Sequence, residues 1–318
     1  MKSCVYVGTV GSGVWSSTDL GETWNPAFEG KEDVDGAWSL SWHPEEPDVV
    51  WAGTARGIVR REGAEQRQVA SPFDDRQVWA LAQSPNDPDL MLAGTRPGAI
   101  FRTRDGGVSW QDLSANVAQE CLIGKTRITR IRFDPIDEET YWVAVEVDGV
   151  HVTRDSGNTW QRLDNGFEFP DIHDLAIVHE NGSRKLLAAT AVGLYTSSDD
   201  GQSWEFQKLE SPWQYTRGLE LGGDCQGTVF LGNGDGPPGS TGRLLRSGDW
   251  GSTWQDANVP GPTNSTVWNI AVNATDPALV YASTILGQVF RSSDCGINWI
   301  KTSGQFEQIR ALLWHPLN

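Results

Sequence analysis

Three carboxyl groups and one histidine in the sequence could perform chemistry on a substrate. Hydrolysis of a sugar bond needs two carboxyl groups about 5 to 9.5 Å apart that flank the bond. The candidates are Glu146, Asp174 and Asp235, with His173 as a further general base or a metal ligand. Glu146 could be base or nucleophile, while Asp174 could be the general acid or could orient His173. Adjacent strand residues point to opposite faces, so we do not expect His173 to pair directly with Asp174.

Four arginines could bind an anionic substrate group, because the guanidinium fork matches a carboxylate in two parallel hydrogen bonds. These arginines are Arg96, Arg130, Arg217 and Arg310. A salt-bridge network that merely closes a channel would use the same residues. The other candidate substrate contacts are three tryptophans and two asparagines, namely Trp38, Trp79, Trp268, Asn233 and Asn269.

The elements that must position these residues are repeats. Six segments share a Ser or Thr, an Asp two residues later, a Gly two after that, and a closing Trp. They are STDLGETW (17–24), TRDGGVSW (103–110), TRDSGNTW (153–160), SSDDGQSW (197–204), SGDWGSTW (247–254) and SSDCGINW (292–299). The first two lie 86 residues apart and the others 44 to 50 apart, so a seventh, degenerate copy is expected around Glu62. Periods of this length are typical of propellers and solenoids.

Each repeat is predicted to form four antiparallel strands. Residues 78–110 read as an alternating apolar strand, a Pro/Asp turn, a second strand, a glycine loop, a third strand, the Asp hairpin and a Trp-led fourth strand. Four-stranded units repeated radially are propeller blades, so we expect an all-β, seven-bladed β-propeller in a single domain, residues 1–318. The expected blades are 1–28 with 305–318, 37–73, 77–113, 127–163, 171–209, 214–258 and 266–302.

The two chain ends predict how the ring closes. The sequence begins with a second strand, VYVGT (5–9), and ends with an inner strand, FEQIRALLWHP (306–316). We therefore expect the C-terminal strand to complete the first blade and leave no open sheet edge.

The inner strands of a propeller line its channel, so their first residues should converge at one channel mouth. Aligned, one position of the seven strands holds Trp38, Trp79, Thr129, His173, Thr216, Trp268 and Arg310. The next position holds Ser39, Ala80, Arg130, Asp174, Arg217, Asn269 and Ala311. Blades two, three and seven thus contribute an apolar wall, and blades four to six a charged wall. Glu146, Arg96 and the insert GNGDGPPGSTG (232–242) lie in loops that should reach the same mouth, although the insert could equally be a plain surface excursion.

The six Asp boxes themselves are expected to be structural. An Asp side chain can accept hydrogen bonds from the backbone of the hairpin that it begins, the glycine can take positive φ, and the Trp can pack into the blade.

This pattern resembles the BNR or Asp-box repeat family, which includes sialidases, xyloglucan-cleaving hydrolases, sortilin-type receptors and photosystem assembly factors. The resemblance covers all seven repeats and implies the propeller fold. The early Phe/Tyr-Arg-Ile/Leu-Pro segment of sialidases is absent, so a typical sialidase is not expected. Xyloglucan-cleaving enzymes use two propellers in tandem, and 318 residues allow one.

Composition excludes several classes of partner. The formal net charge of −17 disfavours nucleic acid and anionic membrane surfaces, and no apolar stretch is long enough to span a bilayer. The four cysteines lie 70 or more residues apart without CxxC spacing, so neither a zinc site nor a disulfide scaffold is indicated. We expect a cytoplasmic monomer with reduced thiols and without metal or cofactor; a secreted chain lacking its leader would look the same.

Two functions follow from these observations. The first is a hydrolase-like propeller, of glycosidase or lyase type, that acts on a carbohydrate or small carboxylate-bearing molecule at the channel mouth. The second is a non-catalytic propeller that serves as a protein-binding or assembly scaffold. An enzyme should have a closed pocket of a few hundred cubic ångströms, whereas a scaffold should show a broad exposed patch.

Overall fold

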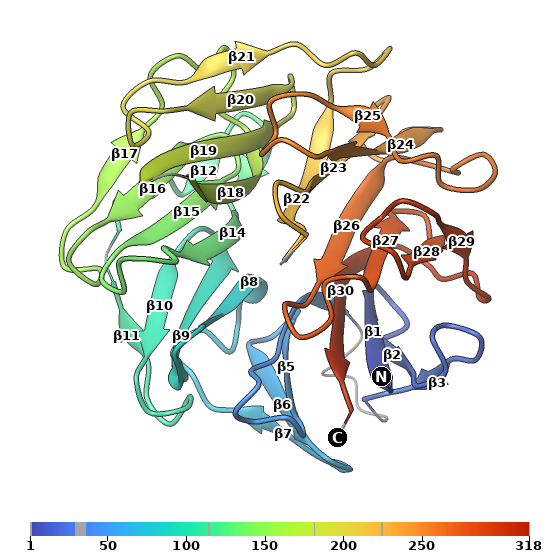
Figure 1. The fold of residues 1–318 in the computed structure, drawn as a ribbon. Coiled ribbons are helices and arrows are strands. Elements are labelled where there is room, and N and C mark those ends of the chain that lie inside the picture. The colour runs from blue at the N-terminus through green and yellow to red at the C-terminus, as the bar shows by residue number, and fades with distance from the viewer. Residues whose placement is uncertain (1, 29–35, 114, 181, 224, 318) are drawn as a thin grey trace.

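The computed structural model describes residues 2–28, 36–113, 115–180, 182–223 and 225–317, and its strands form a ring of seven four-stranded antiparallel sheets (Figure 1). The described residues contain no helix, and accordingly none that could cross a membrane. The predicted seven-bladed propeller is therefore confirmed.

Every blade runs from an inner strand at the channel to an outer strand at the rim. Blades one to three comprise β30 (Ile309–Pro316), β1 (Ser3–Thr9), β2 (Val14–Ser17) and β3 (Asn25–Pro26); β4 (Ala37–Ser41), β5 (Val49–Thr54), β6 (Ile58–Glu62) and β7 (Glu65–Val69); and β8 (Gln77–Ser84), β9 (Asp87–Arg96), β10 (Ile100–Thr103) and β11 (Gln111–Asp112). Blades four and five comprise β14 (Ile128–Phe133), β15 (Tyr141–Val145), β16 (Gly149–Thr153) and β17 (Gln161–Leu163); and β18 (Ile172–Glu180), β19 (Ser183–Thr190), β20 (Leu194–Ser197) and β21 (Glu205–Gln207).

Blades six and seven complete the ring. They comprise β22 (Thr216–Leu221), β23 (Val229–Gly234), β24 (Gly242–Ser247) and β25 (Gln255–Asp256); and β26 (Val267–Val272), β27 (Val280–Thr284), β28 (Val289–Ser292) and β29 (Ile300–Lys301). A separate two-stranded hairpin, β12 (Glu120–Cys121) with β13 (Gly124–Lys125), lies between blades three and four in the sequence.

The ring closes as the chain ends predict. β30 pairs antiparallel with β1, from Ser3 opposite Pro316 to Thr9 opposite Ile309. The two chain ends consequently lie near each other in one blade (Figure 1).

Apolar side chains fill the spaces between neighbouring blades. Trp142 and Tyr195, for example, belong to one buried cluster that also holds residues of β16 and β18. The blades approach closely at small residues of the second strand. A Cβ on Gly94 would lie 2.4 Å from Ile128, and one on Gly232 would lie 2.3 Å from the Val267 carbonyl oxygen. These contacts explain why a glycine interrupts strands that are otherwise apolar.

The Asp boxes have the structural role that their sequence predicts. The Asp155 carboxylate accepts hydrogen bonds from the Thr159 backbone N–H (2.8 Å), the Thr159 hydroxyl (2.6 Å) and the Thr153 hydroxyl (2.8 Å), which lower its pKa to about 2. Gly157 has φ +89°. Each described box thus ties its own hairpin together.

One expectation about the cysteines is wrong. Cys225 and Cys295 form a disulfide with 6.2 Å between their Cα atoms, whereas Cys4 and Cys121 are free. Cys225 follows β22 and Cys295 belongs to the Asp box of blade seven, so the bond joins two neighbouring blades. Two cysteines 70 residues apart in sequence are brought together because the repeat places them side by side in the ring.

Candidate functional site

A β-bulge at the start of the inner strands directs side chains into the channel. The pairing of each inner strand with its neighbour shifts near its first residues, for example between Ile172 and Asp174 and between Val267 and Asn269. Corresponding shifts occur in the other five blades. The bulge leaves one residue outside the ladder, free to turn toward the axis. We call these seven residues the mouth ring: Trp38, Trp79, Thr129, His173, Arg217, Trp268 and Arg310.

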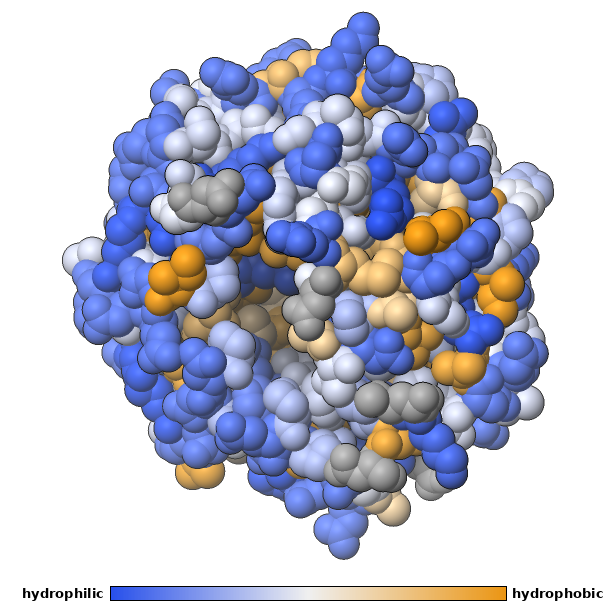
Figure 2. Space-filling model, in the orientation of Figure 1, coloured by the Kyte–Doolittle hydropathy of each residue, from blue (hydrophilic) through white to orange (hydrophobic). Residues whose placement is uncertain are grey.

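The mouth ring lines a central cavity of about 290 Å³. Nine of the thirteen candidate residues line it: Asp174, His173, Arg130, Arg217, Arg310, Trp38, Trp79, Trp268 and Asn269. Figure 2 shows the channel from the end opposite the β12–β13 hairpin, and this face is also hollowed near its centre. The inner-strand alignment is wrong by one residue in blade six, where Arg217 and not Thr216 is the mouth-ring residue. The Thr216 hydroxyl is instead buried against the Thr190 backbone.

A second layer of side chains lies two residues before the mouth ring, on the same face of each strand. Several members contact the ring residue that follows them. Arg217 Nε donates to the Tyr215 hydroxyl at 2.7 Å, and Arg310 Nη2 donates to Gln308 Oε1 at 3.1 Å. Arg127, also in this layer, forms an ion pair with Glu146. At these blades the mouth is therefore two residues deep.

Arginines lie against Trp79 and Trp268 at the mouth, while Trp38 and Trp79 are neighbours with their ring centroids 6.1 Å apart. The Arg127 guanidinium lies 4.1 Å from the Trp79 ring centroid, and that of Arg217 lies 3.8 Å from Trp268. Arg310 lies between the two tryptophans, 5.5 Å from Trp79 and 5.3 Å from Trp268. Each cation faces an aromatic ring, an arrangement that is favourable when solvent is largely excluded.

Positive charge exceeds negative charge at this end of the channel. Four guanidinium groups, from Arg96, Arg127, Arg217 and Arg310, face the carboxylates of Glu146 and Asp171. Burial together with the charges of Arg127 and Arg217 lowers the pKa of Arg310 to about 10. The Nε–H groups of Arg127 and Arg310 are buried without a hydrogen-bond partner in the structure. Such donors are costly to leave unpaired, so the mouth is suited to receive an acceptor.

The pKa values of the two mouth carboxylates, Glu146 and Asp171, shift in opposite directions. Burial raises the pKa of Glu146, although the ion pair with Arg127 opposes the rise. Burial alone would raise the pKa of Asp171 as well, but its contact with His173 and the nearby Arg217 hold it below the usual value.

Both ring nitrogens of His173 contact protein oxygens. Nδ1 lies 2.6 Å from the Thr216 carbonyl oxygen, and Nε2 lies 3.3 Å from Asp171 Oδ2. Burial and the charge of Arg217 lower its pKa. As expected, it does not pair with Asp174. An imidazole engaged at both nitrogens is poorly placed to accept a proton from a substrate.

Asp174 is the centre of a structural network. Arg130 donates to both of its oxygens, at 2.6 and 2.5 Å, and the backbone N–H groups of Leu175 and Leu219 donate at 2.8 and 3.0 Å. Arg132 approaches at 3.5 Å and continues the network to Glu220. These partners overcome the effect of burial and lower the pKa of Asp174. A carboxylate held ionised in this way does not suit the predicted general-acid role, and Arg130 is likewise occupied.

Four other candidates lie at or beyond the edge of the cavity. Asn233 is fully buried in β23, where its amide nitrogen donates to the carbonyl oxygens of Trp213 and Tyr215. Asp235 is exposed and accepts from the Ser240 backbone and hydroxyl. Both side chains are thus engaged by other protein groups, and neither lines the cavity. Glu146 and Arg96 lie at the rim, next to Arg127 in each case.

Four residues that matter here were not among the candidates: Arg127, Arg132, Asp171 and Tyr215. Arg127, Asp171 and Tyr215 directly precede the inner strands β14, β18 and β22. The signal that could have found these three is the strand period of two, counted backward from each mouth-ring residue. In the described part of the chain no three His, Cys, Asp or Glu side chains are grouped to hold a metal ion.

Comparisons with known proteins give one family and several structures. A family model described as photosynthesis system II assembly factor YCF48 matches residues 65–227. No curated protein matches the sequence.

The similar solved structures are propellers. A GH74 xyloglucanase from Xanthomonas campestris aligns with a TM-score of 0.65 and 20% identity over 83% of this chain and 45% of that chain, so this chain spans less than half its length. YCF48 bound to a D1 peptide aligns with a TM-score of 0.61 and 19% identity, over 87% of this chain and 85% of that chain. YCF48 from Cyanidioschyzon merolae aligns with a TM-score of 0.55 and 14% identity, over 83% of this chain and 84% of that chain. Identities this low support the shared fold alone.

Proposed function

The chain belongs to the family of photosynthesis system II assembly factor YCF48, and we propose that it is a non-catalytic binding propeller whose mouth holds a carboxylate of a partner polypeptide. One observation carries this proposal. Three arginines, Arg127, Arg217 and Arg310, converge on two tryptophans, and two of them have buried N–H groups without a partner.

The charge balance supports an anionic ligand. The protein as a whole has a formal net charge of −17, yet four guanidinium groups outnumber two carboxylates at the mouth. Assembling like charges in a buried site lowers stability, so such a cluster is expected where a ligand supplies the missing negative charge.

The dimensions and the comparisons support a peptide end in preference to a sugar chain. A cavity of about 290 Å³ is at the small end for ligand sites and accommodates one or two residues. The similar YCF48 structure holds a peptide, whereas the aligned part of this chain covers only 45% of the GH74 xyloglucanase.

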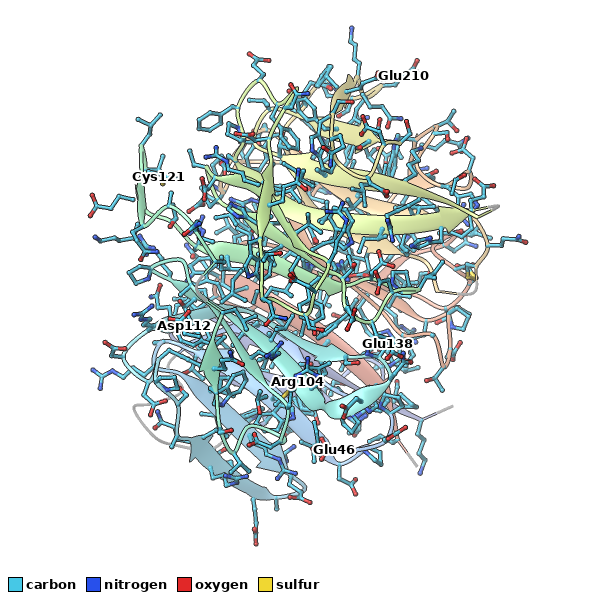
Figure 3. All side chains as sticks on the ribbon, turned by 90° about the vertical axis from the view of Figure 1, so that its left-hand side faces the viewer. Glu46, Arg104, Asp112, Cys121, Glu138 and Glu210 are labelled. Carbon is cyan, nitrogen blue, oxygen red and sulfur yellow. A yellow bond between two sulfur atoms is a disulfide. The ribbon has the colours of Figure 1, made fainter. Side chains whose placement is uncertain are left out.

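Calorimetry tests the proposal with one peptide in two forms, bearing a free or an amidated C-terminus. We expect only the free carboxylate to bind, and Arg217→Met to weaken it about 10- to 100-fold, the size of a charge-assisted hydrogen-bonded pair. Arg104→Met is the matched control, because Arg104 is an exposed arginine on the β10–β11 turn (Figure 3). Equal binding of the two forms, or equal loss in both variants, would refute the proposal.

A hydrolase is the second candidate, favoured by the opposite pKa shifts of Glu146 and Asp171. Two neighbouring carboxyl groups, one with a raised pKa and one with a lowered pKa, can act as general acid and general base. The test is a screen of acidic glycosides and lactones. Turnover that Glu146→Gln abolishes without changing the melting temperature would support this candidate. Turnover that survives the substitution would exclude Glu146 as its acid, and no turnover across the screen would count against the hydrolase.

A further inference from the structure

The hairpin β12–β13 carries two adjacent apolar residues at its tip that the fold leaves uncovered. Leu122 is 88% exposed and Ile123 is 58% exposed. Cys121, on the same hairpin, lies at the far left of the molecule in Figure 3, where the hairpin projects from the blades. Other large exposed apolar residues, such as Val108 and Ile297, are single residues of Asp-box turns. Single exposed apolar residues are common, whereas an apolar pair on a projecting hairpin points to a contact.

The base of the hairpin is fixed to the loops around the channel mouth. Before the hairpin, the Ala118 N–H donates to Asp148 Oδ2 at 2.9 Å, and the Gln119 side chain donates to the Gly98 carbonyl oxygen at 2.7 Å. After it, Arg96 Nε lies 3.5 Å from the Lys125 carbonyl oxygen. These contacts attach the hairpin to blades three and four at the edge of the mouth.

The hairpin and the arginine cluster are also adjacent along the chain. Arg127 follows Lys125 by two residues and Leu122 by five. An extended chain advances at most about 3.3 to 3.6 Å per residue, so the tip lies within roughly 17 Å of the Arg127 backbone. A ligand that extends from the mouth toward the tip covers this distance with about five residues.

We propose that Leu122 and Ile123 form a second contact for the polypeptide whose carboxylate occupies the mouth. The inference rests on the proposed function and specifies its ligand: a chain with an apolar side chain three to five residues before its C-terminal carboxylate. The apolar side chain packs on the hairpin tip while the carboxylate accepts hydrogen bonds from the arginines. Affinity thus comes from the mouth, and selection among carboxylate ends comes from the hairpin.

Two other occupants fit the tip less well. Leu122 and Ile123 together offer roughly 200 Å² of apolar area, far below the about 800 Å² per partner of a stable dimer. The net charge of −17 repels an anionic lipid surface. A polypeptide already held at the mouth needs only a small additional contact, because the second contact is then intramolecular.

Labelled ten-residue Gly/Ser peptides with a free C-terminus test the inference by fluorescence anisotropy. One leucine is placed from two to eight residues before the end, and a leucine-free peptide and its amide report on the mouth alone. We expect the wild type to bind about fivefold tighter when leucine is three to five residues from the end. The double variant Leu122→Ser with Ile123→Ser should lose this preference and keep the difference between carboxylate and amide. Val108→Ser with Ile297→Ser is the matched control and should behave as wild type.

The possible failures are distinguishable. A leucine preference that persists in the hairpin variant would overturn the inference and leave the proposed function intact. A wild-type dimer that the hairpin variant abolishes, seen by sedimentation, or hairpin-dependent flotation with phosphatidylcholine vesicles, would also overturn it by identifying another occupant. Equal binding of carboxylate and amide in the wild type would overturn the proposed function, and the inference with it.

Discussion

Replacing Arg310 by methionine should stabilise the free protein while weakening its ligand binding. Burial and the neighbouring arginines lower the pKa of Arg310 from its ordinary value to about 10, which corresponds to a destabilisation of roughly 3 kcal/mol at neutral pH. Methionine keeps the apolar stem of the side chain but loses two cation–π contacts, with Trp79 and Trp268, worth about 0.5 to 1 kcal/mol each. The expected net gain in unfolding free energy is about 1 to 2 kcal/mol.

The assay is equilibrium urea unfolding of wild type, Arg310→Met and Arg310→Lys at pH 7 without ligand. Arg310→Lys keeps the charge and should gain little. Since the pKa of Arg310 is lower in the folded state than in the unfolded state, the destabilisation is complete below about pH 10 and declines as the pH rises from there toward the ordinary pKa of an arginine. The advantage of the methionine variant should therefore shrink above pH 10. A loss of stability in Arg310→Met at pH 7 would refute the reasoning, because Arg310 would then be a net structural contact.

Three further perturbations test other parts of the account. Asp174→Asn should cost about 3 to 5 kcal/mol of unfolding free energy at pH 7, since it leaves buried arginines unpaired. The deficit should shrink below pH 4, where the wild type loses the same ion pairs. An unchanged unfolding free energy at pH 7 would contradict the structural role of this network. Cys225→Ser with Cys295→Ser should cost about 4 kcal/mol in urea unfolding, because the bond closes a chain of 70 residues, and dithiothreitol should affect only the wild type. Asp249→Asn should lower the melting temperature by a few degrees at pH 7, because it removes hydrogen bonds of the Asp box. These bonds lower the pKa of Asp249 to about 2, so the melting temperatures of variant and wild type should converge as the pH falls from about 4 to 2. A constant difference over this range would be inconsistent with that assignment.

The fold could be predicted from the sequence because its determinants are local. Each Asp box is a hairpin held by its own side chain, so the pattern of Asp155, Gly157 and Trp160 marks a blade wherever it occurs. The spacing of the repeats then predicts the number of blades. The unpaired strand at each end of the chain predicts that the two ends share one blade and close the ring. The disulfide was beyond this reasoning, because only the ring brings Cys225 and Cys295 together.

The site could be predicted only to the level of strand and position. The inner-strand alignment found six of the seven mouth-ring residues, and it failed in blade six, where the bulge lies beside Gly218 and the true member is Arg217. Side-chain partners were not predictable. Arg130 and Arg217 occupy the same position of the alignment, yet Arg130 is bound to Asp174 and Arg217 lies on Trp268. Asp235 turns to its own loop because the hydrogen-bond donors there are nearer than the channel.

A crystal structure of the protein with a short peptide bearing a free C-terminus would show whether the channel mouth binds a carboxylate. We expect the terminal carboxylate at the mouth, within hydrogen-bond distance of at least two of Arg127, Arg217 and Arg310, with the N-terminal part of the peptide directed toward the β12–β13 hairpin. A peptide bound at the outer strands, or in the channel with its carboxylate away from all three arginines, would contradict it.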